Sequence, residues 1–401
     1  MAGTLDRAAE LLLGEEGAVA TEAEMRVVMV SAAISVAGVM VISPIVSSLA
    51  GPLSVTPAKA GQLIAAFTAP SILLTPVTGV LADRMGRKPV LVGGLVLFGL
   101  AGGAIALVAD YRMVLALRVL QGAGYAGTIP LTVTIIGDLY DGAREATAQG
   151  LRVTSIQLVS LGAPLVASVL VARSWRLPFL LFLPALAIAA WAWVTLPTAH
   201  TPAETTLSAY VRELLGALRE PGTTLVVATF AVRFFLTFGY LTYVSVLLAT
   251  RFGASTLLSG LAVSGWGLTS LLATTQSGRV TARVDGRLVL VVGFVGAALG
   301  LAVMSFGLAG FAVGLLAFGL GTGITGPVQK SILTQLAPPD LRGGAVSAGV
   351  IAQAVGQTLG PVVMGAALAT GDPGSVFVVL GLAGGGLGAV VSLLAHRYGD
   401  R

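Results

Sequence analysis

"GVLADRMGRK", residues 79–88, lies between two long apolar segments and concentrates charge in a chain that has little of it. Charged residues make up 10% of the 401 residues, yet Asp83, Arg84, Arg87 and Lys88 all fall within this stretch. Soluble domains average about 25% charged residues. A chain that is 56% hydrophobic and so poorly charged cannot cover a globular surface with solvated groups. The composition therefore predicts an integral membrane protein.

The composition also excludes several kinds of chemistry. The chain has no cysteine, so it has no disulfide, thiol nucleophile or thiolate metal site. Its two histidines, His200 and His396, have no metal-ligand partner nearby, and none of the three lysines follows a glycine as a phosphate-binding loop requires. We expect no metal, no cofactor and no enzymatic activity. Because the basic residues are spread between apolar segments, lipid headgroups are the expected partners rather than nucleic acid.

Twelve segments are apolar over the roughly 20 residues that a membrane-spanning helix needs. They predict an all-α membrane protein with twelve transmembrane helices in two pseudo-symmetric six-helix bundles. The expected domains are a tail over 1–24, a bundle over 25–197, a linker over 198–222 and a bundle over 223–397. Apolar residues at helical spacing between 207 and 218 predict an amphipathic helix in the linker. The expected spans are 25–47, 57–80, 89–109, 112–139, 147–171, 177–197, 223–249, 256–277, 288–308, 310–334, 345–369 and 375–396.

Orientation follows from Lys and Arg, because short loops with excess positive charge stay in the cytoplasm. With both termini on one side, fifteen of the 23 Lys and Arg residues fall on that side and five on the other. The remaining three, Arg118, Arg233 and Lys330, fall within spans. The sequence therefore predicts a multi-pass protein of the cell membrane with both termini cytoplasmic. Residues 79–88 then form a cytoplasmic loop between the second and third spans.

The two halves repeat with a nearly constant offset. Gly86-Arg87 matches Gly286-Arg287 in the corresponding loop, which indicates an internal duplication. Small and helix-bending residues also recur, in the fifth and eleventh spans. Proline removes a backbone hydrogen bond from a helix, so we expect bends at these positions. The candidate bending residues are Gly162, Pro164, Gly360 and Pro361.

Three motifs resemble those of the major facilitator superfamily, and the resemblance extends over essentially the whole chain. "GVLADRMGRK" resembles the family's signature in the loop between spans two and three at every defined position. "LALRVLQGAGYAG", residues 115–127, is similar to its span-four signature. "LVSLGAPLVASVL", residues 158–170, is a degenerate match to the span-five signature of its antiporters. The resemblance implies two bundles that rock around a site at the membrane midplane.

The resemblance also implies that the loop at 79–88 is a cytoplasmic latch. Asp83 would hold the two halves together when the protein opens outward, and Arg87 offers a rigid hydrogen-bonding fork. Gly79 would let neighbouring helices approach closely. In the second half Arg283 aligns with Asp83, so the latch is expected to be asymmetric. The candidate gating residues are Gly79, Asp83, Arg84, Gly86, Arg87 and Lys88.

Polar side chains within spans should face the interior of the bundle or a wet cavity. Spans three, six, nine and twelve carry no charged, Gln or Asn side chain in their apolar cores, so we expect them to face lipid. Lys330 lies near the end of span ten, and its side chain is expected to extend to the headgroups. Aromatic candidates for an apolar pocket wall are Phe234, Phe235, Phe238 and Trp266. The candidate substrate-binding residues are Gln121, Arg233, Tyr240, Tyr243, Gln329 and Gln357.

These features predict a secondary active transporter, working as a monomer, that exports small amphipathic molecules by proton antiport. The efflux element comes from the resemblance. Two alternatives stay open: exchange or uptake of a small anionic metabolite through Arg118 and Arg233, and a lipid flippase or non-transporting membrane receptor. None of the 18 acidic residues lies in the middle of a span. If protons are partners, the carrier is therefore expected to be Asp83, Asp138 or another carboxylate at a helix end, and Asp138 is favoured because it ends span four. The resemblance implies a role in structure or proton coupling for Arg118, so the candidate coupling residues are Arg118 and Asp138.

Overall fold

The structure is a computed structural model that describes residues 15–198, 207–338 and 341–399. Every regular element in these ranges is a helix. Most of the expected N-terminal tail and part of the linker lie outside the described residues. Twelve described segments are long and apolar enough to cross a membrane, which confirms the predicted number of spans. Their ends agree with the predicted bounds to within a few residues.

The first half contains six spans, five of which are built from two or three consecutive helices. A short helix, η1 (Glu15–Thr21), precedes them. The spans are α2 (Ala23–Met40) with η2 (Ser43–Ile45) and α3 (Val46–Leu49); α4 (Pro57–Thr68) with α5 (Pro70–Met85); α6 (Arg87–Ala104) with η3 (Ile105–Leu107); α7 (Tyr111–Tyr125) with α8 (Thr128–Leu139); α9 (Gly142–Val171); and η4 (Leu177–Phe182) with α10 (Pro184–Thr195).

In the second half each described span is one continuous α-helix. The linker helix is α11 (Leu207–Ala217), and the spans are α12 (Pro221–Phe252), α13 (Thr256–Thr281), α14 (Gly286–Val303), α15 (Gly307–Leu336), α16 (Arg342–Leu368) and α17 (Pro373–Gly399). In the first half, two of the spans are interrupted at a proline: Pro70 begins α5 directly after α4, and Pro184 begins α10 directly after η4. By contrast, α9 and α16 run unbroken through Pro164 and Pro361, so bends at those sites remain predictions.

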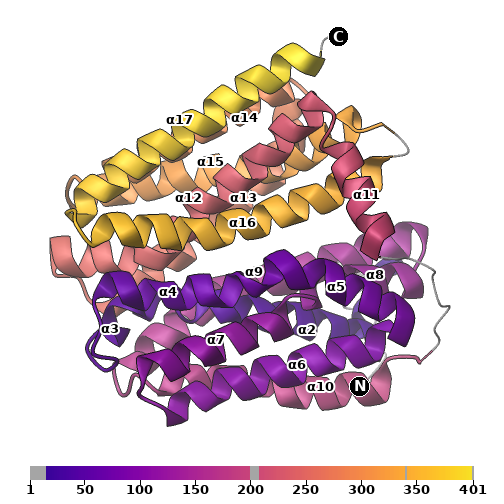
Figure 1. The fold of residues 1–401 in the computed structure, drawn as a ribbon, viewed down its shortest axis with the longest axis horizontal. Helices are drawn as coiled ribbons and strands as arrows, with labels where there is room; N and C mark the ends of the chain where they lie inside the picture. The colour runs from indigo at the N-terminus through magenta and orange to yellow at the C-terminus, as the bar shows by residue number, and fades with distance from the viewer. Residues whose placement is uncertain (1–14, 199–206, 339–340, 400–401) are drawn as a thin grey trace.

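The two halves form separate bundles that lie side by side, with the first half coloured indigo to magenta and the second red to yellow (Figure 1). Contacts between them are made by η2, α3, α4, α5 and α9 on one side and α11, α12, α13 and α16 on the other. Helices α6, α10, α14 and α17 pack within their own half and expose apolar side chains such as Leu100, Val194, Val292 and Val390. This placement fits the predicted lipid-facing role of spans three, six, nine and twelve.

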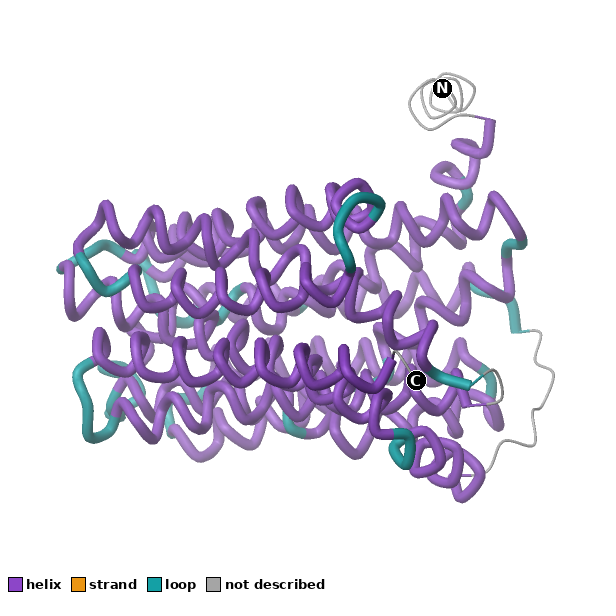
Figure 2. Tube along the Cα trace, turned by 90° about the horizontal axis from the view of Figure 1, so that it is seen from above, coloured by secondary structure: helices purple, strands orange, loops and turns teal. Residues whose placement is uncertain are grey.

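Both ends of the described chain lie toward the same end of the helices (Figure 2). We call this end the termini face and the other end the opposite face. Helix α11 lies at the termini face, where it packs on α16 and reaches α5 of the other half. A Cβ on Gly344 of α16 would crowd the backbone of α11 at Leu214, 3.1 Å away. The predicted linker helix is confirmed, and Leu214 and Leu218 of its apolar face join a core of the second half.

The loop at residues 79–88 contains a sharp turn between α5 and α6. Gly86 makes it possible, because its φ of 93° lies in a region that side chains disfavour. Its counterpart Gly286 begins α14 instead, where the Asp285 carboxylate accepts a hydrogen bond from the Arg287 backbone N–H at 2.6 Å. The two loops therefore differ in backbone as well as in sequence, as the asymmetric motif predicted.

Candidate functional site

Hydrogen bonds join the two halves toward the opposite face. The Ser43 hydroxyl donates to the Leu241 carbonyl, and the Ser47 backbone N–H donates to the Ser245 hydroxyl at 3.3 Å. Both pairs are separated by 198 residues, which equals the offset between Gly162 and Gly360 in the repeat. Each residue thus meets its own counterpart, so the axis that relates the halves passes between η2–α3 and α12. Further bonds between the halves are Ser48–Thr256 at 3.2 Å, Thr68–Thr358 at 3.1 Å and Ser264 to Leu161 at 2.7 Å.

Tyr243 is the largest side chain in this closure and is fully buried. Its hydroxyl donates to the Ala58 carbonyl of the first half at 2.9 Å and to the Pro361 carbonyl of its own half at 3.0 Å. Gly61 of α4 and Gly365 of α16 form the walls of its slot, since a Cβ on either would overlap the tyrosine. In this conformation Tyr243 seals the opposite face, and its hydroxyl is occupied by backbone carbonyls rather than open to a substrate.

Arg118 ties three spans of the first half together. Its guanidinium donates to the Leu63 carbonyl of α4 at 3.0 Å, to the Gly38 carbonyl of α2 at 2.8 Å and to Gln121 Oε1 at 2.6 Å. It also lies 4.5 Å from the centre of the Phe67 ring. The Arg118 side chain is fully buried, so its charge-assisted hydrogen bonds all go to groups of α2, α4 and α7 and hold these helices together. This geometry explains why a span-four arginine is tolerated in an apolar bundle.

The candidate gating residues divide into two groups. Arg87 forms an ion pair with Asp138 and donates to the Thr134 carbonyl at 3.0 Å, which fixes the turn to the end of α8. Lys88 donates to the Leu196 carbonyl at 2.8 Å and lies over the Trp193 ring, which fixes the turn to the end of α10. These residues border a cavity of about 480 Å³ at the termini face.

Asp83 and Gly79 make none of the contacts expected of a closed latch. Among the residues that the structure describes, none gives Asp83 a hydrogen bond or ion pair. Nothing lies within 4 Å of a Cβ built on Gly79. The close helix approach predicted at Gly79 is therefore absent in this conformation. Because the opposite face is closed, a latch that engages only when the protein opens outward would be released here.

Asp138 lies far from Arg118, although both belong to span four. The twenty residues between them correspond to roughly 30 Å of helix. Asp138 is 54% exposed at the termini face, where it pairs with Arg87. Nearby, Tyr140 donates to Glu22 at 2.7 Å, and Arg144 also pairs with Glu22. Burial and the Glu22 carboxylate raise the pKa of the Tyr140 hydroxyl well above its ordinary value.

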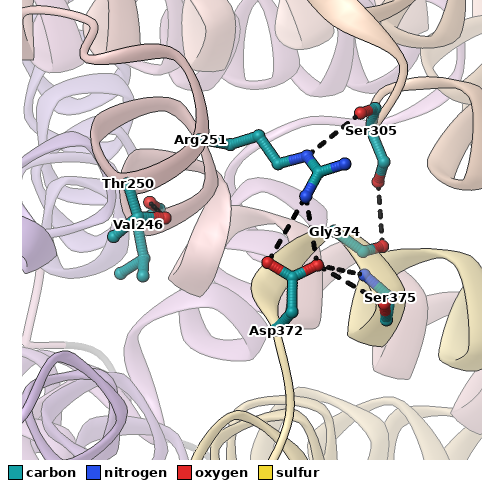
Figure 3. A network of polar contacts seen from close by, with 7 residues as sticks. All are labelled: Val246, Thr250, Arg251, Ser305, Asp372, Gly374 and Ser375. Atoms are coloured by element: carbon teal, nitrogen blue, oxygen red, sulfur yellow. Dashed lines mark hydrogen bonds and ion pairs between the residues drawn. The ribbon is translucent and has the colours of Figure 1, made fainter.

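A second polar network connects the loops of the second half at the opposite face (Figure 3). Arg251 at the end of α12 contacts Asp372 at 3.3 Å and donates to the Ser305 carbonyl at 3.4 Å. The Ser305 hydroxyl donates to the Gly374 carbonyl at 2.9 Å, and the Ser375 N–H donates to Asp372 at 3.1 Å. The network ties the loops at the opposite face within one half, so it stabilises that half rather than joining it to the other.

Thr322 of α15 gathers polar and aromatic groups in the second half. Arg233 Nε of α12 donates to its carbonyl at 2.8 Å, and Trp266 Nε1 of α13 donates to its hydroxyl at 3.1 Å. The guanidinium of Arg233 lies over Gly326, where an added Cβ would stand 2.8 Å from Nη2. Arg233 and Trp266 are both half-buried. No described residue accepts a hydrogen bond from the two Nη atoms of Arg233.

Lys330 lies on the same face of α15 as Thr322 and Gly326, since these residues are spaced four apart. Its side chain is exposed and has no hydrogen-bond or ion-pair partner among the described residues. It is close enough to Arg233, and to Arg152 of α9 in the other half, for electrostatic repulsion. Lys330 therefore faces the region between the halves. The predicted extension of its side chain to the lipid headgroups stays a prediction.

The other candidate binding residues are buried and mostly engaged. Tyr240 donates to the Ala262 carbonyl at 2.9 Å, and Gln329 donates to the Thr229 hydroxyl at 2.9 Å. Gln121 is held by Arg118, although its Nε2 and the Oε1 of Gln329 have no partner. Gln357 is 4% exposed. Substrate roles for these residues stay predictions, and among the described residues no hydrogen-bond partner is found for Gln357 or for the Nη atoms of Arg233.

Sequence reasoning did not connect Arg152 or Lys330 with Arg233, because it counted Arg152 only among the fifteen Lys and Arg residues of the cytoplasmic side and expected Lys330 to extend to the headgroups. The spacing of Thr322, Gly326 and Lys330 could have placed Lys330 on the Arg233 side of α15. Of the aromatic candidates, Trp266 lies beside Arg233. Phe235 instead lines a groove between α12, α16 and α17 that helices of the other half do not border. It is therefore not part of a wall shared with Trp266.

Comparison with known proteins agrees with this architecture. The sequence profile of the Major Facilitator Superfamily matches residues 28–264 and 243–399, so the chain belongs to that superfamily. A solved structure of a bacterial homologue of the human lysosomal transporter Spinster, in an inward-facing and unoccupied conformation, is similar with a TM-score of 0.74. The likeness covers 94% of this chain and 96% of that one at 17% identity, and it confirms the fold.

Two curated bacterial relatives are similar over part of the chain. A bacillibactin exporter of Bacillus subtilis is 36% identical over 147 residues, which cover 34% of this chain and 36% of the relative. The quinolone resistance protein NorA of Staphylococcus aureus is 25% identical over 173 residues, which cover 43% of this chain and 44% of the relative. The matches thus span less than half the length of either relative. The family and fold are those of membrane transporters, and the Bacillus subtilis relative is named as an exporter.

Proposed function

We propose that this chain is a secondary active transporter that exports small amphipathic molecules by alternating access, with protons moving in the opposite direction. The observation that carries the proposal is the one-sided closure of the two halves. Hydrogen bonds from Ser43, Ser47, Ser48 and Tyr243 join the halves at the opposite face. At the termini face no described residue pairs with Asp83, and Lys330 is exposed.

Alternating access follows physically from this arrangement. The closure contains a few hydrogen bonds, each worth about 1 kcal/mol, and a buried apolar core that includes Ile42 of the first half and Leu241 of the second. Each half is held internally by buried groups such as Arg118 and by the Arg251 network. The halves can therefore move as bodies. The direction of export rests on the exporter relatives and on a cytoplasmic location of the termini face.

Transport by purified protein in liposomes tests the proposal. The probes are bacillibactin and a quinolone, the compounds named for the two relatives. Molecules whose termini face points outward should accumulate a probe when the liposome lumen is acidic, and a protonophore should abolish the accumulation. Accumulation that ignores the pH gradient would remove proton coupling. Failure to move either probe in any gradient, by protein that still shows the expected topology, would count against the exporter assignment.

Asp138 remains the proposed coupling carboxylate, now with a physical route. Protonation of Asp138 would break its ion pair with Arg87 and free the α5–α6 turn from α8. We expect Asp138→Asn to retain substrate exchange but lose proton movement linked to it. Asp141→Asn is the matched control, because Asp141 is exposed three residues further along the same connection and its side chain does not cap α9. Proton flux that is intact in Asp138→Asn would eliminate this route.

A further inference from the structure

We propose that Arg233 and Lys330 of the second half, with Arg152 of the first, form an anion-binding subsite between the halves, and that the exported molecule is an amphipathic anion. The proposal rests on the proposed function and names its substrate class. The anionic group, a carboxylate or a phosphate, would bind the three cations. Trp266 would contact the apolar part of the molecule.

The directions of the three side chains support a common site. Side chains on an α-helix tilt toward its N-terminus. Helices α9 and α12 begin at the termini face, so Arg152 and Arg233 tilt toward that face, whereas α15 ends there and Lys330 tilts toward the midplane. Lys330 lies one turn beyond Gly326, the residue over which the Arg233 guanidinium lies. The charged ends therefore converge at one depth from helices of both halves.

The cluster lacks a countercharge of its own. Arg152 Nε donates to Gln149 Oε1 at 3.0 Å, and Arg233 Nε donates to the Thr322 carbonyl, so their bonds go to neutral oxygens. The described ion pairs involve Arg87, Arg144 and Arg251 instead. Each described acidic residue lies outside the middle of the spans. Cations held near one another in a partly desolvated site repel, and a bound anion offsets that repulsion.

The geometry suits a planar anionic group with an aromatic neighbour. The two Nη atoms of Arg233 have no acceptor among the described residues, and two guanidinium nitrogens of this kind can bind a carboxylate or phosphate through two parallel bonds. Lys330 supplies a compact ammonium on a flexible side chain, which can move to bind another oxygen of the same anionic group. Trp266 is fixed beside Arg233 by its bond to Thr322 and remains half-buried, so part of its ring is free for an apolar body. Because the cations come from both halves, the affinity for an anion should change when one half moves relative to the other.

The test is binding of 1-naphthoate to purified protein in phosphatidylcholine nanodiscs, measured by equilibrium dialysis against empty nanodiscs. The uncharged 1-naphthamide has the same ring system and reports on apolar binding alone. We expect 1-naphthoate to bind at least about tenfold more tightly, since hydrogen bonds to charged groups are worth more than neutral ones. Equal affinities for the two probes in the wild-type protein would overturn the proposal without any need for a variant.

Substitutions then locate the site. Lys330→Gln, Arg152→Gln and Arg233→Gln should each remove most of the preference for 1-naphthoate, whereas Lys330→Arg should keep it. Lys59→Gln is the matched control, because Lys59 is exposed at the start of α4 on the opposite face. A loss of preference that is equal in Lys59→Gln and Lys330→Gln would show a general charge effect and contradict the assignment. Thermal stability, measured alongside, identifies any variant that fails to fold.

A lipid headgroup could supply the same anionic chemistry, and phosphatidylglycerol tests that source. If the cluster serves a lipid, phosphatidylglycerol should stabilise the wild type but not Lys330→Gln, and 1-naphthoate should fail to bind in phosphatidylcholine; this result would overturn the substrate assignment. The two proposals fail separately. Selective binding of 1-naphthoate without transport would support the anion-binding subsite and contradict export. Transport without a preference for charged probes would support export and contradict the subsite.

Discussion

Replacing Tyr243 by Phe should loosen the closure at the opposite face without disturbing either half. The change removes only the hydroxyl, which donates to the Ala58 carbonyl at 2.9 Å and to the Pro361 carbonyl at 3.0 Å. One lost hydrogen bond costs about 1 kcal/mol, and a buried carbonyl left without a donor adds about 1 kcal/mol more. In an outward-open state water would reach the Ala58 carbonyl, so the penalty applies chiefly to the closed state.

A shift of about 1–2 kcal/mol corresponds to a factor of roughly 5–30 in the ratio of open to closed molecules. The assay uses a single cysteine at Ser245, which is fully buried in the seam beside Ser47 and should react with a maleimide only when the seam opens. The wild-type chain has no cysteine, so labelling reports on this position alone. The rate should rise about five- to thirtyfold in Tyr243→Phe when opening limits labelling.

Tyr240→Phe is the matched control for this experiment. It makes the same chemical change three residues earlier, but the Tyr240 hydroxyl donates to the Ala262 carbonyl within the second half. We expect it to lower thermal stability and to leave the labelling rate unchanged. If Tyr243→Phe labels no faster than wild type, or if Tyr240→Phe accelerates labelling equally, Tyr243 is not the residue that seals the halves. A changed substrate affinity with unchanged labelling would instead support the binding role predicted from the sequence.

Three further predictions concern topology, the loop and the buried arginine. Single cysteines at Met85 and Ala254 should label from opposite sides of the membrane, with Met85 cytoplasmic; labelling of both from one side would contradict the topology. Asp83→Asn should express near normally but lose most transport, because the latch is needed only in the outward-open state. Full activity in this variant would show that the charged loop only sets the topology. Arg118→Ala should lower the free energy of unfolding by about 3–5 kcal/mol and Arg118→Lys by less, because the carbonyls of Gly38 and Leu63 lose charged donors. Thermal denaturation in detergent measures this loss, and a stable Arg118→Ala protein that fails only in transport would favour a coupling role.

The amino-acid sequence by itself determined the number of spans, the linker helix and the family. These properties depend on local composition: a bilayer requires about 20 apolar residues per helix, and hydropathy along the chain records that requirement directly. The loop motif and the repeat of Gly86-Arg87 at Gly286-Arg287 likewise need no knowledge of distant contacts. The expectation that four spans carry apolar outer surfaces also rests on local composition, since a polar side chain is costly where a span faces lipid.

The functional roles of the polar residues within spans were decided only by the tertiary structure. Arg118 and Arg233 look alike in the sequence, each an arginine inside an apolar segment. Arg118 finds the carbonyls of Gly38 and Leu63 and is fully buried, whereas Arg233 keeps donors free between the halves. The difference arises because helix packing brings together carbonyls and side chains that are 55 to 89 residues apart in the chain. Local sequence records how costly a buried charge is, but only the packed bundle determines which groups satisfy it.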